Sequence, residues 1–363
     1  MENIHGVVNI SKTNTMFSYQ AWPTVCKDDK GVLYCVASGF RMAHVCPWGK
    51  TVMYKSFDEG KSWTPPMIIN DTFLDDRDAG IVYLGNGKLL VTFFNHPASV
   101  YLGADYNDIR RRSDRKEAAP TLGMMGMYPQ LNEEEGRGGS WCILSEDYGN
   151  TWSYPYKVPV SAPHGPCLCK DGSLLYLGRE WISDGELPVY TLAAYRSKDD
   201  GKTWSLEGIV NTPEGYNPRF LCEPHVIELP SGRLYGVIRL SDYSTNPHTY
   251  TMFTTYSDDG GKTWTPLKET GADGMPGHLM LHSSGALVLS YGKRYEPYGE
   301  FAMVSYDNGE TWEENYTIFE NACDPDLGYP ASVELSDGKI LTVYYQKPTP
   351  DQKCAILQTI WEL

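Results

Sequence analysis

The sequence has no long apolar run and comparatively little positive charge. None of its stretches approaches the roughly 18 consecutive apolar residues that a membrane-spanning helix needs. Its beginning, MENIHGVVNISKTNTMF, has neither the basic start nor the apolar core of a secretion signal. Lysine and arginine number 31 against 46 aspartate and glutamate residues, so the formal net charge is −15. We therefore expect neither a membrane nor a nucleic acid as a partner.

Cysteine is present, but without the pattern of a disulfide framework. The nine cysteines are an odd number with no regular spacing, so we interpret them as reduced thiols of a cytoplasmic protein. Cys167 and Cys169 lie two residues apart in a strand-like run, with His164 nearby. A metal site is conceivable there, but two side chains on one face of a strand are expected to pack. We expect no metal and no cofactor.

What the sequence does have is one eight-residue phrase that occurs five times. All copies fit S-x-D-x-G-x-[ST]-W, here called the Asp box. Asp and Ser side chains satisfy local backbone N–H groups, Gly tolerates a positive φ, and the terminal Trp can fill the space under the turn. The box therefore predicts a β-hairpin turn with an aromatic anchor, and its role is structural. The copies are SFDEGKSW (Ser56–Trp63), SEDYGNTW (Ser145–Trp152), SKDDGKTW (Ser197–Trp204), SDDGGKTW (Ser257–Trp264) and SYDNGETW (Ser305–Trp312).

A second, weaker repeat predicts the number of structural units. Six segments each combine an apolar strand, a short turn that contains Gly, and a second strand. Together with two outer strands joined by the box, they predict an all-β fold, a six-bladed β-propeller with five Asp-box hairpins, in one domain of residues 1–363. We expect the sixth blade to be closed by the C-terminal strand KCAILQTIWEL beside the N-terminal GVVNIS. The segments begin at Trp22, Asp78, His164, Glu223, Pro276 and Tyr329.

The second unit is longer than the others because of an insertion at about residues 95–139. The insertion contains the charged runs IRRRSDRKEAAP and NEEEGRGG. Two interpretations stay open. It is either a solvated excursion, or a loop that folds over the mouth of the propeller or mediates self-association into a homo-oligomer.

Propellers bind ligands at one mouth of the central channel, so corresponding positions of the units predict its lining. In an acidic protein, arginine at one repeated position favours an anionic ligand over separate surface salt bridges. Arg77 could join these arginines or be neutralised by Asp75, Asp76 and Asp78. The arginines just after the second strand are Arg41, Arg179, Arg239 and Arg294. At the strand entries we expect Trp22, Asp78, His164, Glu223 and Tyr329 to line the same mouth.

The boxes, the six units and the residues of the mouth resemble the sialidase (neuraminidase) superfamily over most of the chain. In that family a Tyr paired with a Glu is the nucleophile, an Asp is the acid/base, and three Arg residues bind the sugar carboxylate. Tyr329, in LGYPASVELSDGKILTVYY, matches the nucleophile segment, and Glu223, in LCEPHVIELPSGRLYGVIR, matches the Glu segment. The resemblance makes Arg239 one of the three arginines, and Arg294 falls where another is usual.

Blade one departs from this family. The family's R-I-P motif reads A-W-P around Trp22, so its Arg is absent. The acid/base Asp is also absent, and the loop GFRMAHVCPWGK offers Arg41 and His44 instead. Arg41 could replace the missing clamp, and His44 could protonate the leaving oxygen because an unperturbed His titrates near pH ~6.5. The other candidates for the acid are Asp75, Asp76 and Asp78.

Three functions are compatible with these residues. The first is a sialidase-like glycoside hydrolase that releases a terminal acidic sugar, because a neutral Tyr nucleophile avoids repulsion by the sugar carboxylate. The second uses the same fold on another sugar, such as a uronic acid, through two carboxylates such as Glu223 and Asp78. The third is a non-catalytic propeller that binds a carbohydrate or a protein, with Trp22, Trp48 and Trp181 filling the mouth.

Overall fold

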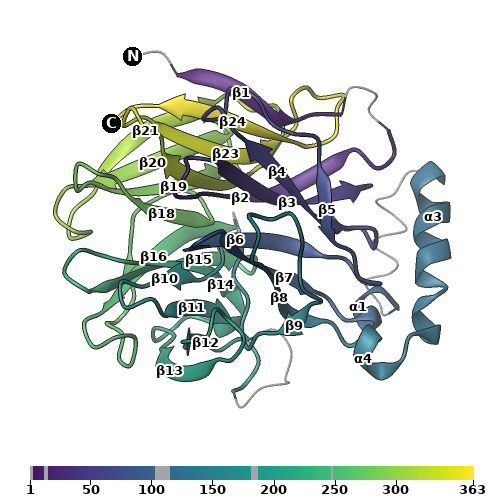
Figure 1. The fold of residues 1–363 in the computed structure, drawn as a ribbon, viewed down its shortest axis with the longest axis horizontal. Helices are drawn as coiled ribbons and strands as arrows, with labels where there is room; N and C mark the ends of the chain where they lie inside the picture. Colours follow the sequence, from purple (N-terminus) through teal and green to yellow (C-terminus); the bar gives the residue numbers. More distant parts are fainter. Residues whose placement is uncertain (1–2, 12–14, 103–114, 181–186, 247) are drawn as a thin grey trace.

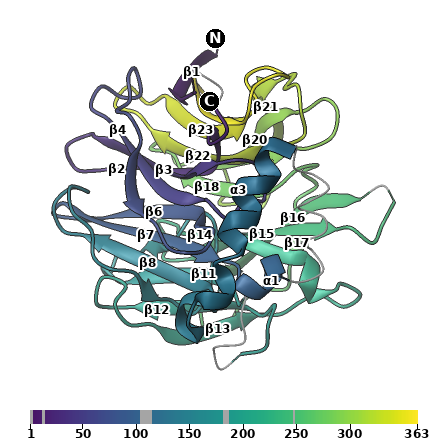
Figure 2. The same cartoon turned by 90° about the vertical axis from the view of Figure 1, so that its right-hand side faces the viewer.

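The protein is a six-bladed β-propeller, as the repeats predicted. The computed structural model describes residues 3–11, 15–102, 115–180, 187–246 and 248–363, and these residues form six four-stranded antiparallel sheets arranged around one axis (Figures 1 and 2). Blades one to three consist of β2 (Tyr19–Lys27), β3 (Leu33–Arg41), β4 (Lys50–Ser56) and β5 (Met67–Asn70); β6 (Arg77–Gly85), β7 (Lys88–Asn95), β8 (Gly139–Ser145) and β9 (Tyr156–Lys157); and β10 (Cys167–Leu168), β11 (Leu174–Arg179), β12 (Leu192–Ser197) and β13 (Ser205–Val210). Blades four to six consist of β14 (Leu221–Glu228), β15 (Leu234–Asp242), β16 (Thr249–Ser257) and β17 (Lys268–Glu269); β18 (Gly277–Leu281), β19 (Leu287–Lys293), β20 (Gly299–Ser305) and β21 (Glu313–Glu320); and β22 (Gly328–Glu334), β23 (Ile340–Gln346), β24 (Ala355–Trp361) and β1 (Ile4–Asn9).

Each Asp box forms the turn between the third and fourth strands of its blade. In the first box, Ser56 Oγ donates to Asp58 Oδ1 at 2.9 Å and accepts the Gly60 backbone N–H at 2.8 Å. Asp58 also accepts the backbone N–H of Ser62 at 2.9 Å. The Ser-to-Asp hydrogen bond recurs in the other four boxes. The boxes are therefore local, self-satisfied turns, as their composition predicted.

The hydrophobic core lies between the blades. Val52 of blade one and Leu341 of blade six belong to one buried cluster, and Val237 of blade four shares another with Leu289 of blade five. Each blade thus buries its apolar faces against its neighbours, which is why a single unit would not be stable alone. The ring is closed by the two ends of the chain, because β1 pairs with β24 in antiparallel register, Ile4 opposite Ile360. This confirms the predicted closure.

The insertion in blade two lies on one face of the ring. It contains α1 (Ala98–Leu102), α3 (Arg115–Met125), η1 (Tyr128–Gln130) and α4 (Glu133–Gly136), whereas residues 103–114 lie outside the described residues. The short helix η2 (Pro218–Phe220) precedes β14. Figure 1 shows α1, α3 and α4 on the right-hand side of the propeller. Figure 2 looks at that side and shows α3 lying in front of the strands. The described part of the insertion therefore folds over the propeller, while its role in self-association stays a prediction.

The insertion is anchored to blades one and two by apolar and polar contacts. Met125 and Tyr128 pack on Leu74, which precedes β6. The Tyr101 hydroxyl donates to Asp75 Oδ2 at 3.1 Å.

None of the helices in the described part of the chain is long and apolar enough to cross a membrane. All nine cysteines lie in described segments, and all are free thiols.

Candidate active site

Four strand entries share an unusual backbone conformation at the mouth of the ring. Trp22, Asp78, Glu223 and Tyr329 have φ values of 55°, 49°, 49° and 53°, which are rare for residues other than Gly. In every case the pairing of the first and second strands shifts register at this point. A bulge of this kind turns a side chain away from its regular direction. The fold therefore accepts local strain at four blades to bring these side chains to one place.

Tyr329, Glu223 and Arg239 form a hydrogen-bonded group at this mouth. The Tyr329 hydroxyl donates to Glu223 Oε1 at 2.7 Å. Arg239 forms an ion pair with Glu223 Oε2, and its Nη1 also donates to the Tyr329 hydroxyl at 3.1 Å. The Tyr243 hydroxyl and Ser241 Oγ accept the other Arg239 N–H groups. The phenolic proton therefore already points at a carboxylate, as a nucleophile and its base require.

The charges of this group place the proton on the tyrosine before reaction. Burial, followed by the negative charges of Glu223 and Asp78, raises the pKa of Tyr329 well above its usual value. Burial alone would raise the pKa of Glu223, but the charge and hydrogen bond of Arg239 outweigh it and lower that pKa. Glu223 is therefore ionised at neutral pH and Tyr329 is a phenol, so the carboxylate is available to accept the phenolic proton.

Arg294 is the arginine best placed to meet an anionic ligand. Its Nε donates to the backbone oxygen of Leu327 at 2.9 Å, and its Nη2 donates to the Tyr345 hydroxyl at 3.2 Å. Its guanidinium carbon lies 5.6 Å from the centre of the Tyr329 ring. Both hydrogen-bond acceptors are neutral, and no described carboxylate forms an ion pair with Arg294. Its positive charge therefore lies beside the candidate nucleophile without a direct ion pair, although Asp326 acts on it electrostatically.

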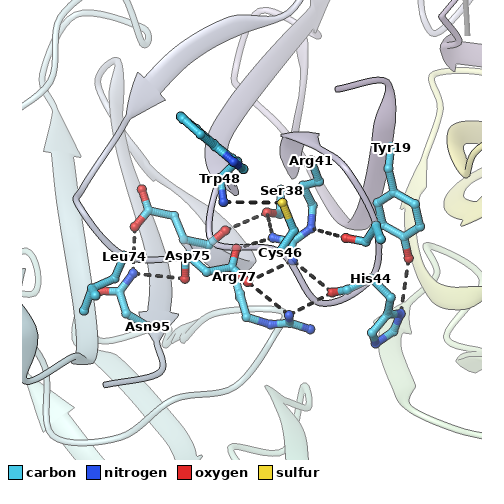
Figure 3. A network of polar contacts seen from close by, with 12 residues as sticks. Tyr19, Ser38, Arg41, His44, Cys46, Trp48, Leu74, Asp75, Arg77 and Asn95 are labelled. Atoms are coloured by element: carbon cyan, nitrogen blue, oxygen red, sulfur yellow. Dashed lines mark hydrogen bonds and ion pairs between the residues drawn. The ribbon is translucent and has the colours of Figure 1, made fainter. Parts of the chain in front are cut away.

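Arg41 and Arg77 are instead held by Asp75 (Figure 3). Arg41 is fully buried and contacts both oxygens of Asp75, with Nη2 at 2.9 Å from Oδ2. Arg77 Nη1 lies 3.2 Å from Asp75 Oδ2 and 3.0 Å from the backbone oxygen of His44. A ligand carboxylate could reach Arg41 only if Arg41 released Asp75. The structure therefore makes Arg41 an internal ion-pair partner and does not bring it to Tyr329.

Trp22 follows Ala21, which stands where the family has its first-blade arginine, and its ring lies against these two cations. The guanidinium carbons of Arg77 and Arg41 lie 4.0 and 4.6 Å from the centre of its ring. Its ring also meets that of Tyr329 edge-on, with 6.4 Å between the centres. An aromatic face attracts cations but offers no hydrogen-bond donor to a carboxylate. At this position the site therefore presents an apolar surface backed by positive charge.

His44 lies edge-on against Trp22, and its side chain is held by Asp326. Its Nδ1 is 2.9 Å from Asp326 Oδ1, and the ring centres of His44 and Trp22 are 5.1 Å apart. The Tyr19 hydroxyl donates to the second oxygen of Asp326 at 2.8 Å. The His44 side chain is 43% exposed, so it can reach a ligand in the mouth. Burial in the crowded mouth lowers the pKa of His44, and the Asp326 carboxylate acts in the opposite direction.

Asp78 is the second candidate for an acid. Burial raises the pKa of Asp78 to about 7, although the charge of Arg77 acts in the opposite direction. The Oδ1 atom of Asp78 is buried without a hydrogen-bond partner. Its neighbour Asp76 has a different role, because Oδ1 and Oδ2 of Asp76 accept hydrogen bonds from Asn95, Asn70 and Thr72 and so connect the strand ends.

Arg179 and His164 do not join the Tyr329 group. Arg179 Nη1 donates to the backbone oxygens of Arg219 and Leu221, at 3.1 and 3.2 Å. His164 Nδ1 contacts Thr24 Oγ1 at 3.1 Å. Thr24 follows Trp22 by two residues on β2, so His164 lies deeper in the channel than the Tyr329 group. Cys169, which the sequence analysis placed beside His164, instead accepts a hydrogen bond from Arg196. Within the described residues, no three His, Cys, Asp or Glu side chains are placed to hold a metal ion.

His164 belongs to a cluster of three buried histidines that should make the fold sensitive to acid. The rings of His225 and His278 stack with centres 4.5 Å apart, and His164 lies 4.9 Å from His278. Burial lowers the pKa of His225 to about 3, and it lowers those of His164 and His278 well below the usual value. An unfolded histidine titrates near ~6.5, so protons bind the unfolded chain preferentially below that pH.

We expect this cluster to remove stability as the pH falls from about 7 to 5, by up to ~2 kcal/mol for each histidine. Urea unfolding at both pH values measures the loss. The His225→Asn variant keeps an acceptor for the Leu279 N–H, which His225 Nδ1 binds at 2.9 Å, but it does not titrate. Between these two pH values, the free energy of unfolding of this variant should therefore fall by about one third less than that of the wild type. Equal losses in both proteins would contradict the assignment.

Sequence reasoning missed Asp326, Tyr19 and Tyr345. Asp326 accepts hydrogen bonds from both tyrosine hydroxyls and contacts His44, so it organises the side of the mouth that faces blade one. Asp326 lies in DPDLGY, three residues before Tyr329 and at the same strand entry, and this position could have indicated its role. Trp48, in contrast, points away from the arginine network in Figure 3. Trp181 lies outside the described residues.

Comparisons with known proteins place this architecture among glycoside hydrolase folds. A sialidase from Clostridium perfringens is 23% identical over 194 residues, which are 47% of this chain and 50% of that protein, so the match spans half the length of this relative. Among solved structures, a protein of unknown function from Dyadobacter fermentans has a TM-score of 0.75 and 23% identity, with 100% of this chain and 99% of that chain covered. The NanB sialidase from Streptococcus pneumoniae has a TM-score of 0.71 and 13% identity, with 98% and 70% covered.

The fold is not restricted to sialidases. An α-L-arabinanase from Penicillium chrysogenum has a TM-score of 0.63 and 14% identity, with 100% of this chain and 99% of that chain covered. At these identities, the solved structures show likeness of fold only. The family model described as a BNR repeat-like domain matches residues 121–342. Because this match covers more than half of the sequence, the chain belongs to the BNR repeat-like domain family, as a divergent, sialidase-like member.

Proposed function

We propose that this protein is a glycoside hydrolase that releases a terminal acidic sugar, a ketoside of the sialic-acid type. The observation that carries the proposal is the Tyr329 hydroxyl, which donates to an ionised Glu223. A carboxylate nucleophile would be repelled by a carboxylate on the reacting carbon of the sugar, whereas a phenol is not. A Tyr nucleophile is the recognised exception among glycosidases.

The proposed reaction has two steps, glycosylation of Tyr329 and hydrolysis of the resulting intermediate. In the first, Tyr329 Oη bonds to the anomeric carbon and its proton passes to Glu223 Oε1, while the glycosidic C–O bond breaks and the leaving oxygen takes a proton from His44. In the second, water gives its proton back to His44 and attacks the anomeric carbon, while the bond to Tyr329 breaks and the phenol recovers its proton from Glu223. The configuration of the sugar is retained.

Arg239 and Arg294 bind the sugar carboxylate in this proposal. Arg294 is supported by its lack of an ion pair with a described carboxylate. Arg239 already pairs with Glu223 and donates to the Tyr329 hydroxyl, so its part in the clamp rests on its match to the family's arginine. The family's third arginine is replaced by Ala21, and the ring of the neighbouring Trp22 lies against Arg77. We therefore propose weaker carboxylate binding than a three-arginine clamp gives, and a preference for an apolar substituent beside Trp22.

A panel of aryl glycosides tests the proposed substrate class. The panel contains the aryl glycosides of sialic acid, its deaminated relative, a uronic acid and neutral hexoses, and kcat/KM is measured for each. We expect the ketosides to be hydrolysed fastest and Arg294→Ala to lower their kcat/KM by about 100-fold. Arg233→Ala serves as the matched control, because Arg233 pairs with Asp258 on the surface of blade four. Equal rates on the neutral hexosides would contradict a carboxylate clamp, and binding of sialic acid without any turnover would indicate a non-catalytic propeller.

A second candidate function is an inverting glycosidase that uses Asp78 as acid and Glu223 as base. It is favoured by the opposite shifts of their pKa values, because burial raises that of Asp78 to about 7 and Arg239 lowers that of Glu223. Such divergence is typical of acid–base carboxylate pairs. NMR of the first-formed product discriminates between the two mechanisms. Retention supports the Tyr329 nucleophile, and inversion supports water activated by a carboxylate.

A further inference from the structure

A second concave site lies outside the Tyr329 group, between blades one and two and the insertion. This groove has a volume of about 1120 Å³, which is the size of a site for a small oligosaccharide rather than for a single sugar ring. Its walls come from the start of β4, the loop that follows β5, the segment after the second Asp box, and the helices α3 and α4. None of Tyr329, Glu223 and Arg239 contributes to its lining.

The groove is lined by aromatic side chains with accessible surface. Tyr154 is 94% exposed and Phe73 is 52% exposed. Trp48, Trp141 and Trp152 complete the walls and are half-buried. Single exposed aromatic residues are common on protein surfaces, but here five aromatic residues gather around one concavity, which is typical of an interaction site. Flat apolar rings of this kind match the C–H faces of pyranose sugars.

The tryptophans of the groove differ from their equivalents in other blades. In the first, third and fourth Asp boxes, the indole N–H of the terminal Trp donates a hydrogen bond of 2.8–2.9 Å within the protein. Trp152, the terminal Trp of the second box, has a buried indole N–H without a partner. The other buried indole N–H groups without a partner in the described part of the chain are those of Trp48 and Trp141. Because these three N–H groups have no exposed surface, they could donate to an occupant of the groove only after a local shift of the indole rings.

The charges of the described lining disfavour an acidic occupant. Lys50 is the only lysine or arginine among the described residues that line the groove, and it already pairs with Asp71. Glu134 and Glu135 of α4 add negative charge at the rim, and Asn132 adds an amide. Carboxylate and amide oxygens accept hydrogen bonds from sugar hydroxyls but repel a sugar carboxylate. The groove and the arginine-rich mouth therefore select ligands of different charge.

We propose that this groove is a binding site for an uncharged pyranose oligosaccharide, whose sugar faces stack on Tyr154, Phe73 and Trp152 and whose hydroxyls meet the acidic rim. The proposal does not depend on the reaction at Tyr329, because the two sites share no residue that either argument uses. An oligosaccharide bound in the groove would hold the protein on a glycan irrespective of whether the mouth cleaves it.

Isothermal titration with lactose, N-acetyllactosamine, xylotetraose and laminaritetraose tests the groove. We expect at least one of them to bind the wild-type protein with a Kd between about 10 µM and 1 mM, and Tyr154→Ala combined with Phe73→Ala to weaken binding at least about 10-fold. Both side chains are exposed, so the double variant should remain folded. Phe57→Ala is the matched control, because Phe57 is 72% exposed in the first Asp box and does not line the groove.

The same titration separates the groove from the candidate catalytic site. Tyr329→Phe should bind the neutral oligosaccharide as the wild type does, and free sialic acid should not compete for it. Quenching of tryptophan fluorescence by the sugar, which Trp152→Phe should reduce, gives a second readout. The proposal is overturned if none of the four sugars binds at a sugar concentration of about 10 mM, or if the double variant binds as well as Phe57→Ala.

Discussion

The Tyr329→Phe variant will hydrolyse acidic ketosides at least about 10³-fold more slowly than the wild type, with little change in affinity for the product sugar. The substitution removes one oxygen atom, and that oxygen is both the nucleophile and the donor to Glu223. The ring of Tyr329 stays beside Trp22, so the shape of the mouth is preserved. Because the carboxylate contacts of Arg239 and Arg294 do not need the phenol, the loss should fall on kcat and spare binding.

Tyr344→Phe is the matched control for this experiment. Tyr344 lies one residue before Tyr345 on β23 and points away from the mouth, where its hydroxyl lies 2.9 Å from Thr359 Oγ1. Both variants lose one buried tyrosine hydroxyl, so a general loss of stability would affect them similarly. A fluorinated acidic sugar that slows the second step should label Tyr329, and mass spectrometry of the digested protein locates the adduct. If Tyr329→Phe and Tyr344→Phe had equal kcat values, the Tyr nucleophile would be excluded.

The sequence predicted the fold well because the signals of a propeller are local. A box, a Gly turn and a strand pair each lie within a few residues, and their order along the chain sets the number of blades. The same regularity placed Tyr329 and Glu223 at equivalent strand entries. Their hydrogen bond joins residues that are 106 positions apart; the alignment of repeats placed both at the mouth, and the family resemblance predicted that they pair.

The partners of the arginines could not be predicted in this way. Arg41 and Arg294 occupy similar repeat positions, but Asp75 reaches Arg41 from the next blade and pairs with both Arg41 and Arg77. Arg294 meets a backbone oxygen and a phenol. Whether a guanidinium is available to a ligand thus depends on one carboxylate from a different blade. The spacing of the repeats does not predict such a contact. The aromatic groove also lay beyond prediction, because the insertion that builds its wall has no counterpart in the other units.

The strained strand entries explain why the site remains in place when its chemistry differs from that of the family. Trp22 adopts the same left-handed conformation as Asp78, Glu223 and Tyr329, although it carries no charge. The bulge aims whichever side chain stands there into the mouth. With Ala21 in place of the family's arginine, Trp22 is the blade-one side chain at this bulge, and we expect this to change what the mouth recognises. The candidate acid His44 lies in the loop after β3, outside this constraint, and is held there by Asp326.

His44→Ala should reveal the acid through its dependence on the leaving group. Sialyllactose has a poor leaving group that needs a proton, whereas a nitrophenyl ketoside does not, so we expect kcat/KM to fall about 10³-fold for the first and less than about 10-fold for the second. In the wild type, kcat/KM should fall as the pH rises through the pKa of His44, which burial places below its usual value. This decrease, the alkaline limb of the pH profile, should be absent from the His44→Ala variant.

Two further variants test whether His44 or Asp78 supplies the proton. Asp326→Asn removes the negative charge that raises the pKa of His44, so the alkaline limb should move to lower pH while both substrates are still hydrolysed. Asp78→Asn should leave the leaving-group dependence of the wild type unchanged. If Asp78→Asn instead spares only the nitrophenyl ketoside, and the wild-type limb lies near pH 7, then Asp78, whose pKa burial raises to about 7, is the acid and His44 only shapes the mouth.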